Sequence, residues 1–451
     1  MLEIKNKCFI PTTERDIMLE QALTISNPAI SKKINLGLSL FGIPNELYYF
    51  EKVENGYYIP LGSMPTLLSH LNQKYGTEYT DHRTECTMPL ELKFTGELRS
   101  YQSDIITTLS NRTVGTISAM TGSGKTVVFV ALTAQKLQCT LILVHTKELA
   151  NQTKKSYLKF TNIEAANIGM IGDGQFNIQP VTVGLYQSLH RLGKTKFEEV
   201  NSSFGLVIAD EAHIVPAATF YNCLTKLSAK YRFGFTATPE RTDGLTKAIF
   251  FAVGPIVHKV PIQELSGVLT IPEYKPIYTE YNFDLFSTKE YTYMINDLSV
   301  DEIRNKLILE NVDKTKFTCI LCSRISQVNL LYEKLQDVAV RLTSKTPKKE
   351  RLAALGLIES GDKTIIISTW ELFAMGIDIP KLEILILASP KKSKVIVTQA
   401  IGRIMRKFDK KALIIDFVDI GIDILKYAFF TRKRIITKIL GELNNGSQNK
   451  S

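Results

Sequence analysis

The run ISAMTGSGKTVVFV, at positions 117–130, limits most strongly how this chain can fold. Its apolar start is typical of a buried strand, and an apolar helical pattern follows the glycines. Between them, the segment from Ala119 to Thr126 approaches the phosphate-loop pattern G-x-x-x-x-G-K-[ST], with Ala119 in place of the first glycine. A strand, glycine-containing turn and helix in this order predict a parallel sheet covered by helices.

The loop also indicates a nucleoside triphosphate site. In such a loop, backbone N–H groups surround the phosphates, the lysine reaches the outer ones, and the next hydroxyl binds Mg²⁺. The alternative interpretation is that two glycines merely end a strand, but the strand before and the helix after favour a functional loop. The expected nucleotide contacts are Thr121, Gly122, Ser123, Gly124, Lys125 and Thr126, and Thr126 is also an expected metal ligand.

A pair of acids ends a second predicted strand. In FGLVIADEAH the apolar run from Phe204 stops at Asp210 and Glu211. Ligands of open α/β sheets bind at the carboxyl ends of the strands, so both carboxylates are expected at the nucleotide. Asp210 is then the Mg²⁺ ligand, and Glu211 directs the attacking water. A solvated acidic turn is the alternative, and His213, which completes Asp-Glu-Ala-His, argues against it.

Charge and composition are consistent with an intracellular protein that binds nucleic acid. Lys plus Arg number 55 against 45 Asp plus Glu, a net charge of +10 that favours a polyanion. Neither a membrane-spanning apolar run nor a signal-peptide pattern is found, so we expect a cytoplasmic protein. Cys319 and Cys322 lie in an apolar run without a second cysteine pair, which indicates a buried strand rather than a metal site.

The order of patterns predicts two α/β domains after a smaller one. Short β-rich runs alternate with helical patterns from about residue 98, become irregular between Val257 and Lys314, and resume at 317. The first ninety residues instead cluster aromatics around a Glu54-Asn55-Gly56 hairpin signal, typical of a small α+β domain. Its tyrosines are interpreted as mainly structural. We expect a 1–93 nucleic-acid-binding accessory domain, an ATP-binding α/β domain at 94–258, a C-terminal α/β domain at 259–440, and a disordered tail at 441–451.

Four motifs in order carry a family resemblance. MTGSGKT, DEAH, GFTATPE and QAIGRIMR resemble the motifs of superfamily 2 helicases and translocases, and the last fits Q-x-x-G-R-x-x-R at every defined position. The resemblance spans about Leu98 to Asp416 and implies two RecA-like domains in tandem, with ATP and Mg²⁺ as cofactors. Arg403 and Arg406 correspond to arginine fingers, whose charge suits the transferring phosphoryl group. The implied catalytic set is Lys125, Asp210, Glu211, Gln399, Arg403 and Arg406.

The same resemblance assigns further contacts. Gln102, aided by Arg99, corresponds to the glutamine that reads adenine, and Gly376 and Asp378 stand in the G-x-D-x-P spacing of a motif that reaches the nucleotide and the nucleic-acid backbone. Thr236, Ala237 and Thr238 correspond to the motif that links hydrolysis to strand movement. The expected nucleic-acid contacts are Thr146, Lys147, Gln187, Ser188, Arg324 and Thr369.

The sequence after GFTATPE narrows the resemblance. An R-x-D-G and a later G-P are similar to those of XPB-type helicases, restriction-enzyme motors and phage branch-migration helicases, with the UvsW-like group most similar. This implies a monomeric, ATP-hydrolysing DNA helicase, phage-encoded by analogy, that unwinds or branch-migrates forked DNA in replication, recombination or repair. Two alternatives stay open: an RNA-directed or transcript-releasing helicase, and a nucleic-acid-binding module with a regulatory ATPase.

Overall fold

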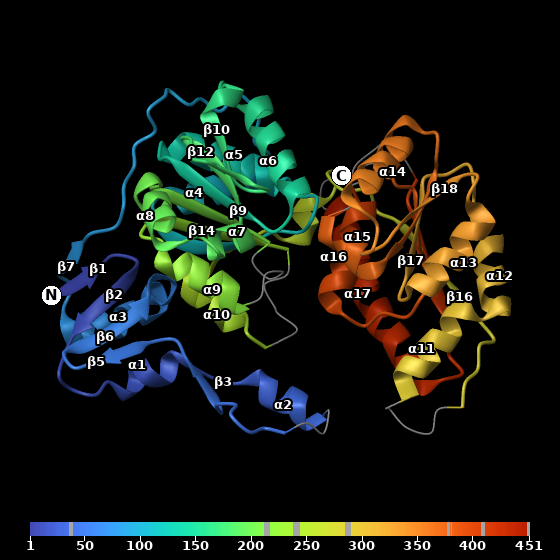
Figure 1. Ribbon diagram of the computed structural model, residues 1–451, viewed down its shortest axis with the longest axis horizontal. Helices are drawn as coiled ribbons and strands as arrows, with labels where there is room; N and C mark the ends of the chain where they lie inside the picture. Colours follow the sequence, from blue (N-terminus) through green and yellow to red (C-terminus); the bar gives the residue numbers. More distant parts are fainter. Residues whose placement is uncertain are drawn as a thin grey trace. The chain divides into compact units, whose positions relative to one another are not determined.

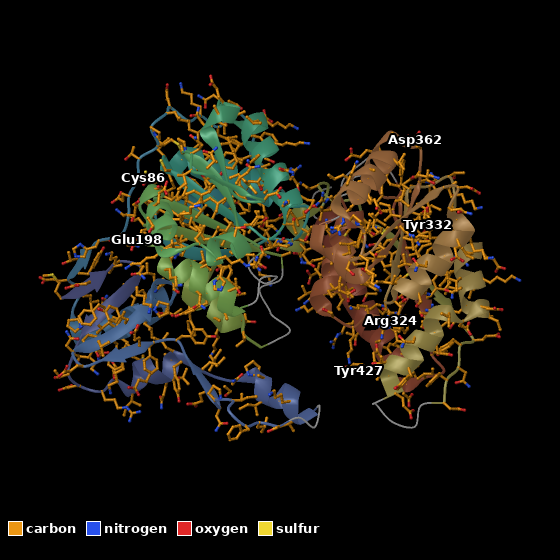
Figure 2. All side chains as sticks on the ribbon, viewed as in Figure 1. Cys86, Glu198, Arg324, Tyr332, Asp362 and Tyr427 are labelled. Atoms are coloured by element: carbon orange, nitrogen blue, oxygen red, sulfur yellow. The ribbon has the colours of Figure 1, made fainter. Side chains whose placement is uncertain are left out.

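The computed structural model describes residues 1–35, 39–211, 217–237, 244–284, 290–376, 379, 381–406 and 411–448. The chain forms two compact units (Figure 1), one of Met1–Met120 with Gly124–Val260, the other of Thr121–Ser123 with Pro261–Ser451. Side chains fill the interior of each unit (Figure 2), and each is described below by itself. The division at Val260 lies close to the boundary expected at 258, whereas the three-domain organisation as a whole stays a prediction.

The larger sheet of the first unit has the strand order β11-β10-β12-β9-β13-β14-β8-β15. All neighbours are parallel except β10 and β11. Every residue of β8, β9, β12 and β13 is buried, as in a parallel sheet covered on both faces. The strands are β8 (Val114–Ser118), β9 (Thr140–Val144), β10 (Ile168–Gly172), β11 (Gln175–Asn177), β12 (Val181–Leu185), β13 (Leu206–Asp210), β14 (Tyr231–Thr236) and β15 (Ile256–Lys259).

The sequence predicted the five central strands correctly and missed three others. The runs at 115–120, 140–145, 181–186, 204–210 and 231–238 correspond to β8, β9, β12, β13 and β14. The missed strands are β10, which contains glycines, and the edge strands β11 and β15. Edge strands carry half-exposed polar residues, so their hydrophobic pattern is weak.

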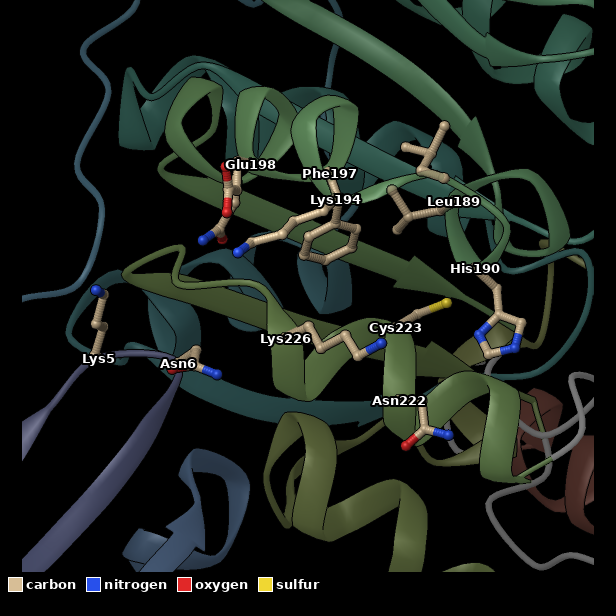
Figure 3. Close-up of a pocket in the computed structure, with 12 residues that line it drawn as sticks. Lys5, Asn6, Leu189, His190, Lys194, Phe197, Glu198, Asn222, Cys223 and Lys226 are labelled. Carbon is tan, nitrogen blue, oxygen red and sulfur yellow. The ribbon is translucent and has the colours of Figure 1, made fainter.

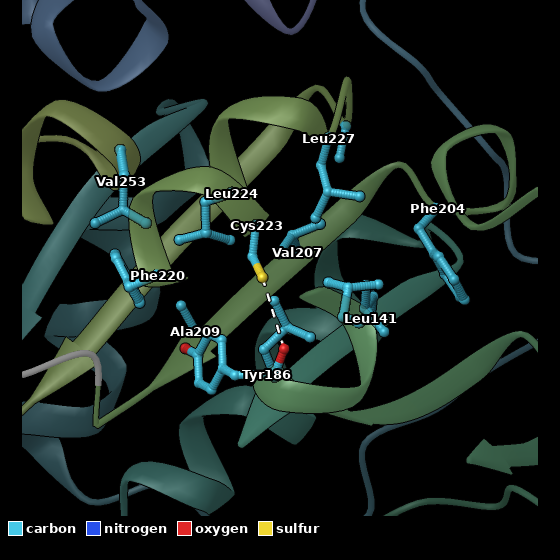
Figure 4. Packing of buried hydrophobic residues seen from close by; sticks show 14 of the residues in the cluster. Leu141, Tyr186, Phe204, Val207, Ala209, Phe220, Cys223, Leu224, Leu227 and Val253 are labelled. Atoms are coloured by element: carbon cyan, nitrogen blue, oxygen red, sulfur yellow. Dashed lines mark hydrogen bonds between the residues drawn. The ribbon is translucent and has the colours of Figure 1, made fainter. Parts of the chain in front are cut away.

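Helices and a buried apolar cluster cover this sheet. Phe220 and Leu224 of α9, Val253 of α10, Tyr186 of α7 and Val207 of β13 pack together, as Figure 4 shows. The helices are α4 (Ser100–Ser110), α5 (Lys125–Lys136), α6 (Lys147–Phe160), α7 (Tyr186–His190), α8 (Lys194–Ser203), α9 (Ala217–Lys226) and α10 (Thr246–Val253).

A separate five-stranded sheet, of order β5-β6-β2-β1-β7, begins the chain. The predicted hairpin is confirmed, because β5 and β6 pair with Val53 opposite Gly56. A Cβ on Gly56 would lie 2.2 Å from the Ile10 carbonyl oxygen, so only glycine fits. The strands are β1 (Leu2–Ile4), β2 (Lys7–Pro11), β5 (Glu51–Val53), β6 (Gly56–Pro60) and β7 (Tyr79–Asp81), with α1 (Ile17–Ala22), α3 (Met64–Tyr75) and an arm of β3 (Thr24–Ser26), α2 (Pro28–Asn35) and β4 (Glu46–Tyr48).

The tyrosines of this segment are divided between the core and the surface. Tyr57 is buried, and the ring of Tyr49 lies 5.0 Å from that of Tyr221 and 5.1 Å from that of Phe251. Tyr48 is 61% exposed and Tyr58 is 38% exposed, so these two rings lie at the surface and for them the structural interpretation stays a prediction. Phe251 belongs to α10, which means that the N-terminal core closes on a helix of the larger sheet.

The second unit contains an all-parallel sheet of order β16-β21-β20-β17-β19-β18. Helix α13 buries Val328, Leu331 and Leu335 on one face, and Cys319 and Cys322 are fully buried in β17, both as predicted. The described residues contain no cluster of three or more His, Cys, Asp or Glu that could hold a metal ion. The strands are β16 (Glu273–Tyr278), β17 (Thr318–Cys322), β18 (Ala339–Leu342), β19 (Ile365–Thr369), β20 (Ile384–Leu387) and β21 (Leu413–Val418), and the helices are α11 (Tyr291–Val300), α12 (Glu302–Glu310), α13 (Ile325–Leu335), α14 (Lys348–Ser360), α15 (Trp370–Gly376), α16 (Lys394–Ile404) and α17 (Asp423–Gln448).

Two expectations for this unit are corrected. The passage expected to be irregular contains β16, α11 and α12; β16 alternates exposed with half-buried residues and carries Pro276, as edge strands do. The tail expected to be disordered from Gly441 is helical through Gln448. Ile436, Ile439 and Leu443 are buried at helical spacing, which holds α17 in place, and residues 449–451 lie outside the described part.

A buried ion pair fixes α17 to the sheet. The Arg432 guanidinium donates to both carboxylate oxygens of Asp416 on β21, with an Nη2 to Oδ1 distance of 2.7 Å. Tyr274 of β16 adds a third donor at 2.9 Å.

In the described residues, no helix is both long and apolar enough to cross a membrane.

We predict that Asp16→Ala lowers the free energy of unfolding by roughly 3 kcal/mol, because it removes a buried acceptor shared by several donors. Asp16 is 1% exposed and accepts from His70 Nε2 and Tyr75 OH, both at 2.7 Å, and from the Leu19 N–H. Denaturant titration followed by circular dichroism measures the loss. The control, Glu51→Ala, removes an exposed pair with Lys7 and changes stability by less than about 1 kcal/mol.

The pH dependence of stability provides a second test of the role of Asp16. Burial alone would raise the pKa of Asp16, but the hydrogen bonds from Tyr75, His70 and Leu19 outweigh burial and hold the pKa below its usual range. A carboxyl with a lowered folded-state pKa stabilises the fold above its unfolded pKa near ~4 and loses that contribution at lower pH. An Asp16→Ala protein as stable as the unmutated protein at pH 7 would contradict the assignment.

Candidate active site

The phosphate loop joins β8 to α5. Gly122 and Gly124 have φ values of 87° and 78°, in the left-handed region that glycine adopts without strain. Helix α5 begins at Lys125 with Gly124 as its N-cap and without a side-chain cap bond. First-turn N–H groups at such a helix start attract anions, which is the property a phosphate site requires.

The lysine of this loop is held by one acid. Lys125 Nζ lies 2.6 Å from Glu211 Oε1 and 3.3 Å from the Ala119 carbonyl oxygen. Both side chains of the ion pair are about nine-tenths buried, at 10% and 12% exposed. The pair therefore places the phosphate loop and the acidic motif in direct contact.

The backbone at Glu211 turns sharply away from β13. Glu211 has a φ of 46°, which is uncommon for a residue with a side chain. Its second carboxylate oxygen accepts from the Ala237 N–H at 3.4 Å, at the end of the neighbouring strand β14. One carboxylate therefore contacts the lysine of the loop and the motif after β14. Such a link is suited to transmitting a change at the nucleotide to that motif.

Asp210 provides a buried acceptor for a metal. It is 7% exposed, and its Oδ1 makes no hydrogen bond to any described residue. Burial, and then the negative charge of Glu211, raise its pKa to about 7, while Lys125 lowers it. A buried carboxyl oxygen that no described residue satisfies fits Mg²⁺ or its water shell, and Thr126, the other expected metal ligand, is the second residue of α5.

Gln102 of α4 contacts the phosphate loop. Its Oε1 accepts from the Arg99 N–H at 2.9 Å, and its Nε2 donates to the Gly124 carbonyl oxygen at 3.4 Å. A Cβ on Gly124 would lie 2.6 Å from that amide nitrogen, which explains the glycine there. Arg99 Nη1 donates to Tyr101 OH at 3.1 Å. The glutamine thus connects α4 to the loop, and its role in reading adenine stays a prediction.

Four expected nucleic-acid contacts lie at one edge of the sheet of the first unit. Thr146 follows β9 and caps α6 by accepting from Leu149 N–H, and Lys147 begins that helix and pairs with Asp173. Gln187 and Ser188 lie on α7, directly after β12. Strands β9 and β12 are parallel neighbours, so their carboxyl ends meet.

The remaining expected residues belong to the second unit. Thr369 is the last residue of β19 and lies opposite Cys322, the last residue of β17. Arg324 comes two residues after Cys322, so Thr369 and Arg324 lie at the same edge of the sheet. Arg324, labelled in Figure 2, donates through Nε to Asn296 Oδ1 at 2.7 Å. Gly376 ends α15. His213, Thr238 and Asp378 lie outside the described residues.

Helix α16 carries the glutamine and the first arginine of QAIGRIMR. Gln399 and Arg403 lie within the helix, and Arg406 follows it. Arg403 Nη2 donates to the Ala374 carbonyl oxygen at 2.8 Å, and its guanidinium lies 5.7 Å from the Phe373 ring centroid. These contacts keep Arg403 oriented by α15.

Three contacts at these positions were not expected from the sequence, although Ala119 and Ala237 lie in motifs that it predicted. The Ala119 carbonyl and the Ala237 N–H act through the backbone, which leaves no trace in residue type. Asp173, the partner of Lys147, lies with Gly174 in the turn between β10 and β11, and both have positive φ values. Asp-Gly is a hairpin signal that would have located this turn.

Comparison with known proteins agrees with the geometry. The family described as "Type III restriction enzyme, res subunit" matches residues 95–241, and the "Helicase conserved C-terminal domain" matches residues 300–408. The DNA 3'-5' translocase XPB2 of Sulfurisphaera tokodaii is 28% identical over 369 residues, which cover 72% of this chain and 82% of that protein. A protein of Acanthamoeba polyphaga mimivirus, L396, named as a candidate ATP-dependent RNA helicase, is 29% identical over 407 residues, or 86% of this chain and 76% of its own.

A solved structure shows the same fold. Saccharomyces cerevisiae Dbp5, bound to RNA and ADP BeF3, aligns with a TM-score of 0.56 at 18% identity, over 76% of this chain and 88% of its own. The two parallel-sheet units are tandem RecA-like domains. The chain belongs to the superfamily 2 helicases, which hydrolyse ATP, and it is similar to the XPB-type members.

We predict that Lys125→Ala and Glu211→Gln both abolish ATP turnover but change ATP affinity in opposite directions. Removing the lysine removes a phosphate contact, so affinity falls. Removing the charge of Glu211 releases Lys125 from its ion pair, so affinity rises several-fold while hydrolysis slows at least ~100-fold. Fluorescent-nucleotide titration and phosphate release measure the two effects. Normal turnover in either variant, or weaker ATP binding by Glu211→Gln, would overturn the assignment.

Proposed function

We propose that this protein is an ATP-dependent motor on DNA that unwinds or branch-migrates forked and branched duplexes. The observation that carries the proposal is the contact among Lys125, Glu211 and Ala237, which links the phosphate loop to the motif expected to drive strand movement. The similarity to a DNA translocase over 82% of its length supports DNA as the substrate. The net charge of +10 suits the same partner.

The catalytic roles follow from what each side chain can do. Lys125 exchanges its bond to Glu211 for one to the outer phosphates, which leaves the Glu211 carboxylate available to orient and deprotonate a water molecule. Asp210 holds the water shell of Mg²⁺, and the metal neutralises charge on the phosphates when bound. Because Glu211 also accepts from Ala237, the exchange at Lys125 changes the environment of the segment after β14.

The two arginines complete the site in this proposal. Arg403 is bonded to a neutral carbonyl, Ala374 O, and a phosphate is a stronger acceptor for a guanidinium than a carbonyl is. An always-charged, planar group stabilises the transferring phosphoryl group without changing its own protonation. Hydrolysis then requires both RecA-like domains, which couples ATP use to their movement.

The second candidate is an RNA-directed helicase. The name of the mimivirus relative, a candidate ATP-dependent RNA helicase, favours it. Motor contacts to phosphates do not distinguish DNA from RNA by themselves. The further alternative, a binding module with a regulatory ATPase, fits less well with a complete set of charged groups at the site.

We predict that Arg403→Ala and Arg406→Ala each slow ATP hydrolysis by at least ~1000-fold, as the loss of an arginine finger does, while ATP binding stays within about threefold. Lysine variants at the same positions recover little activity, because an ammonium group lacks the planar, forked pair of N–H donors with which a guanidinium binds two phosphate oxygens. Steady-state turnover and nucleotide titration separate the effects. Equal losses of binding and turnover would assign the arginines to folding.

The substrate is tested by the ATPase rate with no nucleic acid, single-stranded DNA, linear duplex, forked DNA, a four-way junction and single-stranded RNA. We expect the greatest stimulation with forked or four-way DNA. Greatest stimulation by RNA would replace the DNA proposal with the second candidate. Failure of every nucleic acid to stimulate turnover would favour the regulatory-ATPase alternative.

A further inference from the structure

A cavity of about 570 Å³ opens on the first unit, far along the chain from the phosphate loop (Figure 3). Helix α8 and helix α9 form its sides, and the turn between β1 and β2, at Lys5 and Asn6, forms one end. Asn6 Nδ2 donates to the Thr225 carbonyl oxygen at 3.0 Å, which fixes that turn on α9. All of these elements belong to one compact unit.

The lining of this cavity is cationic. Lys5, Lys194 and Lys226 line it together with a single acid, Glu198. Among the described residues, none of these three lysines makes an ion pair or a side-chain hydrogen bond. Some other lysines of the unit do have an acidic partner, as Lys230 has in Glu85 at 2.6 Å. The cavity therefore presents uncompensated positive charge, which attracts a polyanion.

The floor of the cavity is apolar. Leu189 and Cys223 are buried, and Phe197 is half-buried against the same core cluster. A charged rim above an apolar floor suits a ligand with phosphates on one side and flat, apolar groups on the other. The cavity is of the size that takes a small ligand or one or two nucleotides, and it is too small for a duplex.

The position of the cavity connects it with the expected nucleic-acid contacts. His190, at the opposite end from Lys5, is the last residue of α7. The same helix carries Gln187 and Ser188, both expected to bind phosphates. A strand held at α7 can therefore continue between α8 and α9 toward the N-terminal sheet.

We propose that this lysine groove, defined by Lys5, Lys194 and Lys226 above Phe197, binds single-stranded nucleic acid. It holds the strand that leaves α7 and leads it to the N-terminal sheet. The inference rests on the proposed function, because it assumes a nucleic-acid substrate, and it adds a second contact for one separated strand. The groove lies apart from the ATP site, so it contributes to substrate affinity and leaves basal hydrolysis unchanged.

The test compares Lys194→Ala/Lys226→Ala with a control of equal charge, Lys159→Ala/Lys196→Ala. Lys196 lies on α8 outside the groove, over the Phe176 ring at 4.8 Å, and Lys159 lies on α6 over Phe160 at 5.1 Å. The affinity of the full-length chain for an oligo-dT strand is measured by fluorescence anisotropy over a salt series. Thermal unfolding by circular dichroism confirms that each variant is folded.

Each lost phosphate contact lowers the slope of log affinity against log salt by about 0.7 for a single strand. We expect a decrease of about 1.4 in the groove variant, with roughly tenfold weaker binding at low salt, and little change in the control. Lys194→Arg/Lys226→Arg restores both quantities, because it keeps the charge. Blunt duplex binds the groove variant and the control equally.

The inference would be overturned if the groove variant and the control had the same slope of log affinity against log salt. It would also be overturned if the groove variant lost affinity equally for duplex and single-stranded DNA. A loss of affinity for polyglutamate alone would instead make the groove a site for acidic peptides. Failure of the proposed function is distinct. In that case no nucleic acid stimulates the ATPase of the unmutated chain, whereas failure of the groove leaves that stimulation intact.

Discussion

The ion pair between Lys125 and Glu211 depends on the order of strands at the centre of the first sheet. Strands β13, β14 and β8 are consecutive and parallel, with Asp210 opposite Phe235 and Thr236 opposite Ser118. Residues that follow the three strands therefore meet at one edge, although Lys125 and Glu211 are 86 positions apart in the chain. A parallel sheet achieves this without any side chain of the core entering the site.

Sequence patterns predicted the elements that have a regular hydrophobic pattern and missed the contacts made by single backbone groups. Buried central strands show continuous apolar runs, so the five central strands of the first sheet were found. Asp210 and Glu211 were singled out as candidate catalytic acids because carboxylates carry the required chemistry, and they follow β13 as expected. The Ala237 N–H and the Ala119 carbonyl could not be found, because any residue supplies a backbone group. The extension of α17 was missed because the polar residues that follow Leu443 concealed that Leu443 continues the buried spacing of Ile436 and Ile439.

Buried charges organise the second unit in a comparable way. Arg432 pairs with Asp416, and Arg304 pairs with Asp419 at 2.8 Å, with all four side chains nearly inaccessible. Arg304 Nη1 also donates to the Ala388 carbonyl oxygen at 2.5 Å. Such pairs contribute little net stability, but breaking one is costly, so they fix the positions of α12 and α17 against the ends of β20 and β21.

The contact of Phe251 with the N-terminal core has a consequence for synthesis. The first sheet is made early, yet its core includes a side chain from α10, about 190 residues after β6. At 5–20 residues per second, the N-terminal sheet waits roughly 10 to 40 s for that ring to leave the ribosome. During this interval its exposed apolar face is a target for chaperones, and the sheet completes its fold only when most of the first RecA-like domain has been made.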